Sequence, residues 1–205
     1  MKDQLSPLEI DALTEVFNIG VGRAANALNK MVSQAVDLSI PEVELLSNVA
    51  VKSRLNFDAN MEISTVTQSF IGDFRGQGLL MFDQKNGLQL VSELLGNKVP
   101  LDALSELEED SLVEIGNVVL NACFGTIINL LHASITIEMP GFIQGDINKV
   151  FTYTSEQEWS LYIKVKFSLA NKNIVGHIFF LMDITSLEVF QESIRQFVSG
   201  IKSGC

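Results

Sequence analysis

The sequence has little cysteine and little positive charge. Of its 205 residues only two are cysteines, Cys123 and Cys205, and 14 Lys and Arg stand against 25 Asp and Glu. Two cysteines without C-x-x-C spacing exclude a disulfide framework and a cysteine zinc site. The formal net charge of −11 repels phosphate backbones and anionic lipid surfaces. We therefore expect neither nucleic acid nor a membrane among the partners.

Two further features bear on location. The N-terminal sequence MKDQLSPLEI lacks the apolar core of a signal peptide, which together with the few cysteines favours the cytoplasm. The run from Ile115 to Ile137 contains no Asp, Glu, Lys or Arg and is long enough to span a bilayer. It also contains three asparagines and a histidine, and it ends in the β-prone ASITIEMP. We predict a buried helix followed by a strand instead of a transmembrane helix.

The motifs of several enzyme classes are missing. His132 and His177 are the only histidines, and they form neither a metal-ligand pair nor part of a Ser-His-Asp set. No P-loop, dinucleotide fingerprint or nucleophile elbow occurs. The G-x-G within NIGVGRAANAL follows no expected strand, so it does not predict a phosphate-binding loop. We expect no cofactor-binding and no metal-binding residues of the chain's own.

An internal repeat with an offset of 99 residues runs through the chain. Capping boxes at Ser6 and Ser105 predict the starts of two helices at this offset. Each half then carries the pattern D-x3-E-x2-N-x22-P, from Asp11 to Pro41 and from Asp110 to Pro140.

The order of expected elements also repeats, which predicts an α+β fold. In each half a long helix of about 25 residues is followed, after an irregular stretch, by two strands and a short helix. Halves of this size are small for independent stability, so we expect a pseudo-twofold tandem repeat of helix–strands–helix units sharing one sheet. A single domain over residues 1–205 would comprise repeats of about 1–99 and 100–205, connected through residues 96–103. The expected strands are 62–71, 76–83, 160–169 and 174–183, and the closing helices are 86–95 and 185–198.

The two long helices carry the candidate site residues. Glu15 and Asn18 lie one turn apart on one face, as do Glu114 and Asn117. One Glu-x-x-Asn pair is ordinarily a solvated helix face, but this pair recurs, and asparagine is a poor residue in a helix interior. A carboxamide can orient a water molecule, and a carboxylate can pair with a lysine. Such a face suits a protein that completes the active site of another protein.

The remaining positions of these helices are assigned to packing. Gly20 and Gly22 are interpreted as points where helices approach closely, because a missing side chain lets backbones approach. The expected core positions are Leu13, Phe17, Ala24 and Leu28 in the first helix and Leu112, Val119, Cys123 and Ile127 in the second.

The doubled Glu-x-x-Asn, with a proline 23 residues after each Asn, resembles the CheC/CheX/FliY family of response-regulator phosphatases. EVFNIGVGRAANAL is close to the first-helix signature of the CheC branch, and SELEEDSLVEIGNVVLNACFGTI resembles its second-site helix. The resemblance covers essentially the whole chain. A single-domain CheC fits best, because neither the receiver-docking peptide nor the switch domain of the FliY branch is recognised in the sequence.

This resemblance implies a hydrolase, a protein aspartyl-phosphate phosphatase that acts on a phosphorylated CheY-like receiver in chemotaxis. Asn18 and Asn117 would orient the attacking water, and Glu15 and Glu114 would pair with the active-site lysine of the receiver. The chain would have no cofactor of its own, since Mg2+ is expected in the partner receiver. No covalent enzyme intermediate is expected.

Two other functions are kept as alternatives. The helices could belong to a non-catalytic adaptor for a receiver or for the receptor deamidase CheD, which some relatives bind, or to a flagellar switch component. Internal duplication favours a monomer, because the second half can replace a dimer partner. Asp11 and Asp110 are assigned only a helix-starting or docking role.

Overall fold

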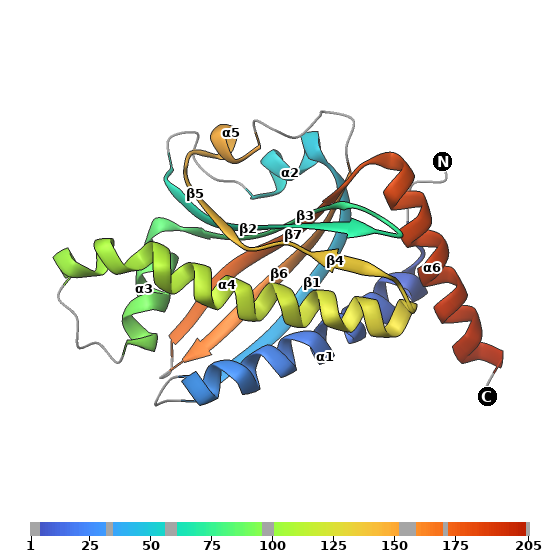
Figure 1. The fold of residues 1–205 in the computed structure, drawn as a ribbon, viewed down its shortest axis with the longest axis horizontal. Coiled ribbons are helices and arrows are strands. Elements are labelled where there is room, and N and C mark those ends of the chain that lie inside the picture. The colour runs from blue at the N-terminus through green and yellow to red at the C-terminus, as the bar shows by residue number, and fades with distance from the viewer. Residues whose placement is uncertain are drawn as a thin grey trace.

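The computed structural model describes residues 5–31, 35–55, 61–95, 101–151, 159–169 and 172–203. Both halves contain helices and strands (Figure 1). The first half contains α1 (Pro7–Met31), β1 (Val36–Ser47), α2 (Asn48–Leu55), β2 (Ile63–Gly72), β3 (Gly76–Asp83) and α3 (Gln84–Leu94). The second contains α4 (Leu101–Leu131), β4 (Ile135–Ile137), β5 (Gly141–Gly145), α5 (Ile147–Val150), β6 (Trp159–Leu169), β7 (Lys172–Met182) and α6 (Ile184–Ser203).

One antiparallel sheet organises the fold. Its strand order is β1-β6-β7-β3-β2-β4, and β5 also pairs with β2. The hairpins β2–β3 and β6–β7 meet in the centre through the β3–β7 pair. Strand β1 from the first half and strands β4 and β5 from the second lie at opposite edges.

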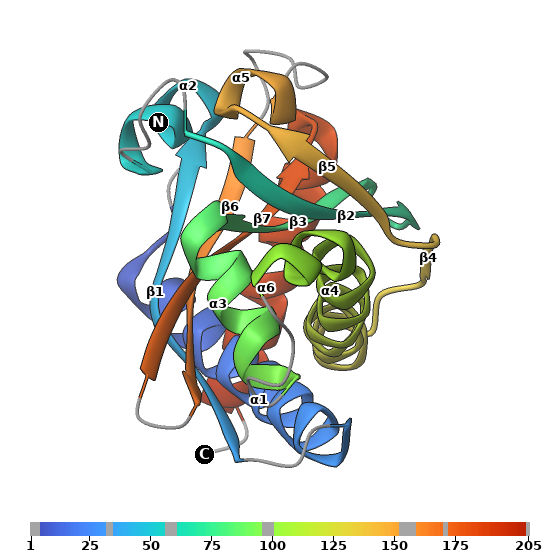
Figure 2. The same ribbon diagram turned by 90° about the vertical axis from the view of Figure 1, so that its left-hand side faces the viewer.

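Helices cover the two faces of the sheet unequally. The long helices α1 and α4, with α3 and α6, lie on one face, and the short helices α2 and α5 lie on the other (Figures 1 and 2). Successive strand residues point to opposite faces, so Phe180 joins the large core and Phe179 the smaller one. The same alternation places Leu80 and Leu79 on opposite faces. Burial on both faces explains why GLLMFD and IFFLMD are continuous apolar runs.

The predicted elements and core positions are confirmed at most points. All four predicted strands and both closing helices are present, and α6 continues to Ser203. Along β6, Leu161 and Ile163 join the large core, and Tyr162 on the other face is buried in the smaller core. The eight predicted core residues are all buried: Leu13, Phe17, Ala24, Leu28, Leu112, Val119, Cys123 and Ile127.

The start of the second long helix differs from the prediction. We expected Ser105 at the N-cap, but α4 begins at Leu101, so Ser105 lies within the helix. Leucine and alanine at 101, 103 and 104 are strong helix formers, and the helix extends over them. Part of the predicted connector is therefore helical, and residues 96–100 lie outside the described residues. At the first helix the capping box is confirmed: the Ser6 amide donates to Glu9 Oε2 at 2.5 Å and the Glu9 amide to Ser6 Oγ at 3.3 Å.

The prediction of an irregular stretch after Pro41 is wrong. Pro41 lies inside β1, at a register shift between Ser39 and Glu42 in the pairing with β6. Proline has no N–H to donate to a strand ladder and is accommodated at a bulge. The strand therefore continues past it to Ser47.

Helix α4 is the apolar run for which a buried helix and a strand were predicted. Its segment Leu107–Leu131 is long and apolar enough to cross a membrane by length and composition. Half of the residues in its most apolar part are buried inside the fold, and β4 follows after Leu131. His132, with φ 51°, follows the helix directly, and the Ala133 amide donates to the Ile128 carbonyl at 3.1 Å. This is a left-handed helix C-terminus.

Gly20 is a packing point between α1 and α4, whereas Gly22 is not. A Cβ at Gly20 would lie 3.0 Å from Thr126 Oγ1 and 3.2 Å from the Ala122 carbonyl oxygen on α4. A Cβ at Gly22 would meet nothing within 4 Å. The close-packing interpretation is therefore confirmed for Gly20 and wrong for Gly22.

This difference predicts opposite effects of one substitution at two neighbouring positions. Gly20→Leu should lower the free energy of unfolding by about 1–3 kcal/mol, because the side chain is forced against the backbone of α4. Gly22→Leu should be neutral or raise it by up to about 1 kcal/mol, since leucine favours the helix over glycine. Urea unfolding of both variants measures this, and equal stabilities would contradict the packing difference.

Candidate functional site

The four predicted site residues lie on the two longest helices, which run antiparallel side by side (Figure 1). Glu15 and Glu114 are exposed, and Asn18 and Asn117 are half-buried. Gly20 faces Cys123 across the helix pair. Asn18 therefore lies level with residue 125 of α4, and Asn117 lies about 12 Å farther along at 1.5 Å per residue. The structure thus forms two separate Glu/Asn pairs and does not bring all four residues together.

The carboxamide of Asn18 is held by the edge strand β1. The backbone amide of Ile40 donates to Asn18 Oδ1 at 3.1 Å. Ile40 precedes Pro41 within the register shift of β1, where the strand ladder is interrupted and an amide needs another acceptor. Because a backbone N–H can only donate, the atom of Asn18 that faces it must be the oxygen, and Nδ2 points away.

The carboxamide of Asn117 is held differently. Its Oδ1 accepts from Asn121 Nδ2 at 2.7 Å, and Asn121 Oδ1 accepts from Gln68 Nε2 at 3.2 Å. Gln68 lies on β2, and its Nε2 also donates to the Glu138 carbonyl at 3.1 Å. In this second site two side-chain amides, those of Asn121 and Gln68, set the position of the asparagine in place of one backbone amide.

Pro140, the proline of the second half, also lies where an edge of the sheet is interrupted. Pro140 separates β4 from β5, and both strands pair with β2. Met139, which precedes Pro140 as Ile40 precedes Pro41, is 88% exposed, whereas Ile40 is 5% exposed. The two sites therefore share a helix motif and a broken edge strand but differ in what lies around them.

Sequence reasoning missed Gln68 and the role of Asn121. Asn121 lies one turn after Asn117 on the same helix, and this i, i+4 spacing of two amides was a detectable signal. Gln68 lies on a strand far away in sequence, and only the packing of α4 on β2 reveals its contact with Asn121.

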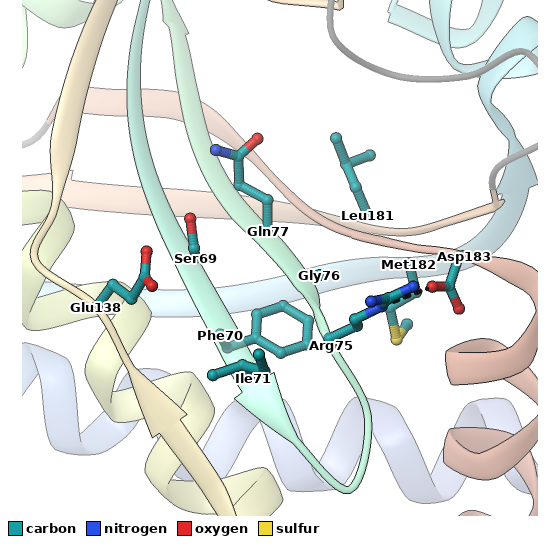
Figure 3. A pocket seen from close by; sticks show the side chains of 10 residues that line it. All are labelled: Ser69, Phe70, Ile71, Arg75, Gly76, Gln77, Glu138, Leu181, Met182 and Asp183. Atoms are coloured by element: carbon teal, nitrogen blue, oxygen red, sulfur yellow. Dashed lines mark hydrogen bonds and ion pairs between the residues drawn. The ribbon is translucent and has the colours of Figure 1, made fainter.

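A hollow of the surface is lined by strands of the central sheet. Its volume is about 490 Å3, and it opens between β2, β3, β7 and the segment after β4 (Figure 3). Glu138 and Ser69 lie at one side of it, and the ion pair of Arg75 with Asp183 lies at the other. None of the four predicted site residues is among those that line it.

Metal or thiol chemistry is not evident in the described part of the chain. Over the ranges that the structure describes, no three His, Cys, Asp or Glu side chains are grouped closely enough to hold a metal ion. Cys123 is a free buried thiol in the core. Burial raises its pKa to about 12, so it is a thiol at neutral pH and not a nucleophile.

Comparison with known proteins gives no match to a family model. The chain is 25% identical to the CheY-P phosphatase CheC of Bacillus subtilis over 137 residues, and this aligned region covers 64% of each protein. It is 22% identical over 169 residues to the flagellar motor switch phosphatase FliY of the same organism, covering 82% of this chain and 44% of FliY. The chain resembles the CheC/CheX/FliY family. It spans less than two thirds of the length of either relative.

Solved structures show the same fold. The crystal structure of Thermotoga maritima FliY matches 94% of this chain with a TM-score of 0.73 at 17% identity. The FliM middle domain from Helicobacter pylori matches 92% with a TM-score of 0.62 at 11% identity. The CheX–CheY–BeF3–Mg2+ complex from Borrelia burgdorferi matches 82% with a TM-score of 0.50 at 19% identity. At these identities the likeness concerns the fold, a mixed α/β arrangement around a single antiparallel sheet.

Tyr162 and His177 form a titratable pair on the face of the sheet opposite to α1 and α4. Tyr162 Oη and His177 Nδ1 are 3.0 Å apart. Burial, with a smaller contribution from Lys164, lowers the pKa of His177 from 6.5 to about 4. A histidine that is held neutral in the folded protein contributes stability above pH 6.5, and this contribution is lost as the pH falls towards 4.

We predict that His177 makes the fold sensitive to mild acid. Between pH 7 and pH 4, protonation of His177 should remove up to about 3 kcal/mol of the free energy of unfolding. His177→Gln should lose less stability over the same interval, while the carboxylates contribute equally to both proteins. Urea unfolding at the two pH values measures the difference, and parallel pH curves would contradict the shifted pKa.

Proposed function

We propose that this protein is a phosphatase that hydrolyses the phospho-aspartate of a CheY-like receiver. The observation that supports it best is the pairing, on each long helix, of an exposed glutamate with an asparagine whose amide orientation is fixed. The relative named CheY-P phosphatase CheC and the structure of a CheX–CheY complex support the same substrate.

In the proposed reaction the receiver supplies Mg2+ and the phosphorylated aspartate. Asn18 or Asn117 enters the receiver site and holds a water in line with phosphorus, using Nδ2 as donor and the second lone pair of Oδ1 as acceptor. The water oxygen forms a bond to phosphorus as the bond to the aspartate oxygen breaks, which releases inorganic phosphate and the carboxylate. Glu15 or Glu114 pairs with the receiver lysine and fixes the orientation of the two proteins.

The organisation of the molecule agrees with two sites in one chain. We propose that residues 1–205 form one domain of two pseudo-twofold repeats, and that the protein acts in the cytoplasm as a monomer. Asn18 lies beside β1 and Asn117 beside the β2–β4 side, so the two sites face opposite edges of the sheet. A receiver at each site is compatible with this arrangement. CheD remains a proposed additional partner.

The second candidate function is a non-catalytic adaptor or a flagellar switch component. The observation that favours it is the similarity of the fold to FliM middle domains. An adaptor would bind the phosphorylated receiver without shortening the lifetime of the phosphate, and a switch component would co-sediment with the motor switch complex.

The phosphatase proposal predicts that the asparagines determine the maximal rate. Asn18→Ala/Asn117→Ala should lower the acceleration of phosphate release from a purified, Mg2+-loaded phospho-receiver by about 100-fold or more. Gln196→Ala, an exposed amide on α6, serves as the control and should retain the wild-type rate. Unchanged phosphate release by the double variant would overturn the proposed catalysis, and binding without acceleration by the wild-type protein would favour the adaptor.

The glutamates should act on receiver binding. In the Asn117→Ala background, Glu15→Gln should raise the receiver concentration at half-maximal rate roughly 3- to 10-fold, because one interfacial charge pair is lost. The maximal rate should change much less. Glu188→Gln, an exposed glutamate on α6, is the matched control. An effect confined to the maximal rate would show that Glu15 does not act through binding.

A further inference from the structure

The second site contains a relay of three side-chain amides that begins at a backbone carbonyl. The Glu138 carbonyl accepts from Gln68 Nε2, which also donates to Asn121 Oδ1. Asn121 Nδ2 then donates to Asn117 Oδ1. The relay crosses from the segment after β4, through β2, to the exposed face of α4.

Each step of the relay fixes the orientation of the next amide. The Glu138 carbonyl can only accept, so the atom of Gln68 that faces it must be Nε2. Gln68 Nε2 can only donate, so Asn121 presents its oxygen to Gln68 and its Nδ2 to Asn117. Turning Gln68 over would place its oxygen against the Glu138 carbonyl and the Asn121 oxygen, which is repulsive.

Burial of Gln68 holds the start of the relay in place. Gln68 is 2% exposed, and its Oε1 has no hydrogen-bond partner within the described residues. The fold thus leaves one buried polar atom unpaired, which costs stability, while both hydrogen bonds donated by Gln68 Nε2 stay directed at their acceptors. The opposite orientation of Gln68 would lose both of these hydrogen bonds.

The first site has a different arrangement at the equivalent point. Asn18 is oriented directly by the Ile40 amide, and the position 99 residues before Asn121 is Gly22, which has no side chain to form a relay. In the second half the residue before the proline is the exposed Met139. The hydrogen bond that orients Asn117 comes from Asn121.

We propose that Gln68 and Asn121 are positioning residues of the second site, and that they hold the Asn117 carboxamide with Nδ2 directed towards the receiver. This inference rests on the proposed function. The first site does not use these residues, so the two sites of one chain can be altered independently without touching either catalytic asparagine.

Asn121→Asp tests the relay in the Asn18→Ala background, in which only the second site is active. The substituted carboxylate keeps the shape of the asparagine and the acceptor for Gln68 but has no donor for Asn117, so Asn117 turns over. The maximal rate of phosphate release should fall about 3- to 10-fold, the value of one hydrogen bond, at an unchanged receiver concentration for half-maximal rate. Asn129→Asp, exposed on the same helix, adds the same charge outside the relay and should keep the rate.

A second measurement separates orientation from overall structure. The side-chain amide resonances of Asn117 in a 1H–15N spectrum should move in Asn121→Asp, whereas those of Asn18 stay in place. In Asn117→Ala, adding Asn121→Asp should cause no further loss, because coupled residues are not additive.

The outcomes distinguish the two proposals. An unchanged rate in Asn18→Ala/Asn121→Asp, or no residual rate in Asn18→Ala alone, would overturn the relay while leaving catalysis at the first site intact. A wild-type protein that never accelerates phosphate release would overturn the proposed function itself.

Discussion

The packing of α1 against α4 is the constraint on which the rest of the structure depends. The two helices approach closely at Gly20, and their buried residues join the strands in one large core. Because each helix buries one face in this way, its other face is available to a partner. The same contact fixes the separation of the two Glu/Asn pairs. A change in helix packing would therefore alter both the stability of the core and the geometry of the candidate sites.

The interrupted edge strands give a structural reason for the spacing between asparagine and proline. In the first half the strand ladder is interrupted around Pro41, and the Ile40 amide donates to Asn18 Oδ1 instead. Asn18 therefore accepts a hydrogen bond from an amide of β1 in addition to its proposed catalytic role, and this hydrogen bond fixes the orientation of the Asn18 carboxamide. In the second half the edge is broken at Pro140, and side chains replace the backbone amide. Two similar motifs thus reach a defined amide orientation through different donors.

Much of the fold could be predicted from local pattern. The apolar runs at 78–83 and 178–183 predicted strands that are present, and the helical spacing of Leu13, Phe17 and Leu28 predicted a buried face that is confirmed. Helix α4 began earlier than its capping box because the strong helix formers at 101, 103 and 104 extend it. The relay could not be predicted, since Gln68 and Asn121 meet only when β2 and α4 pack together. The assignment of Glu15, Asn18, Glu114 and Asn117 as site residues stays a prediction.

The sheet order has a consequence for how the two halves depend on each other. Strand β1 of the first half pairs with β6 of the second, while β4 and β5 of the second half pair with β2 of the first. Each half thus completes the sheet of the other at its outer edge. Separated from its neighbour, either half would expose unpaired strand edges on both sides, which favour aggregation. A replacement for either half would have to supply the same edge strands to the other.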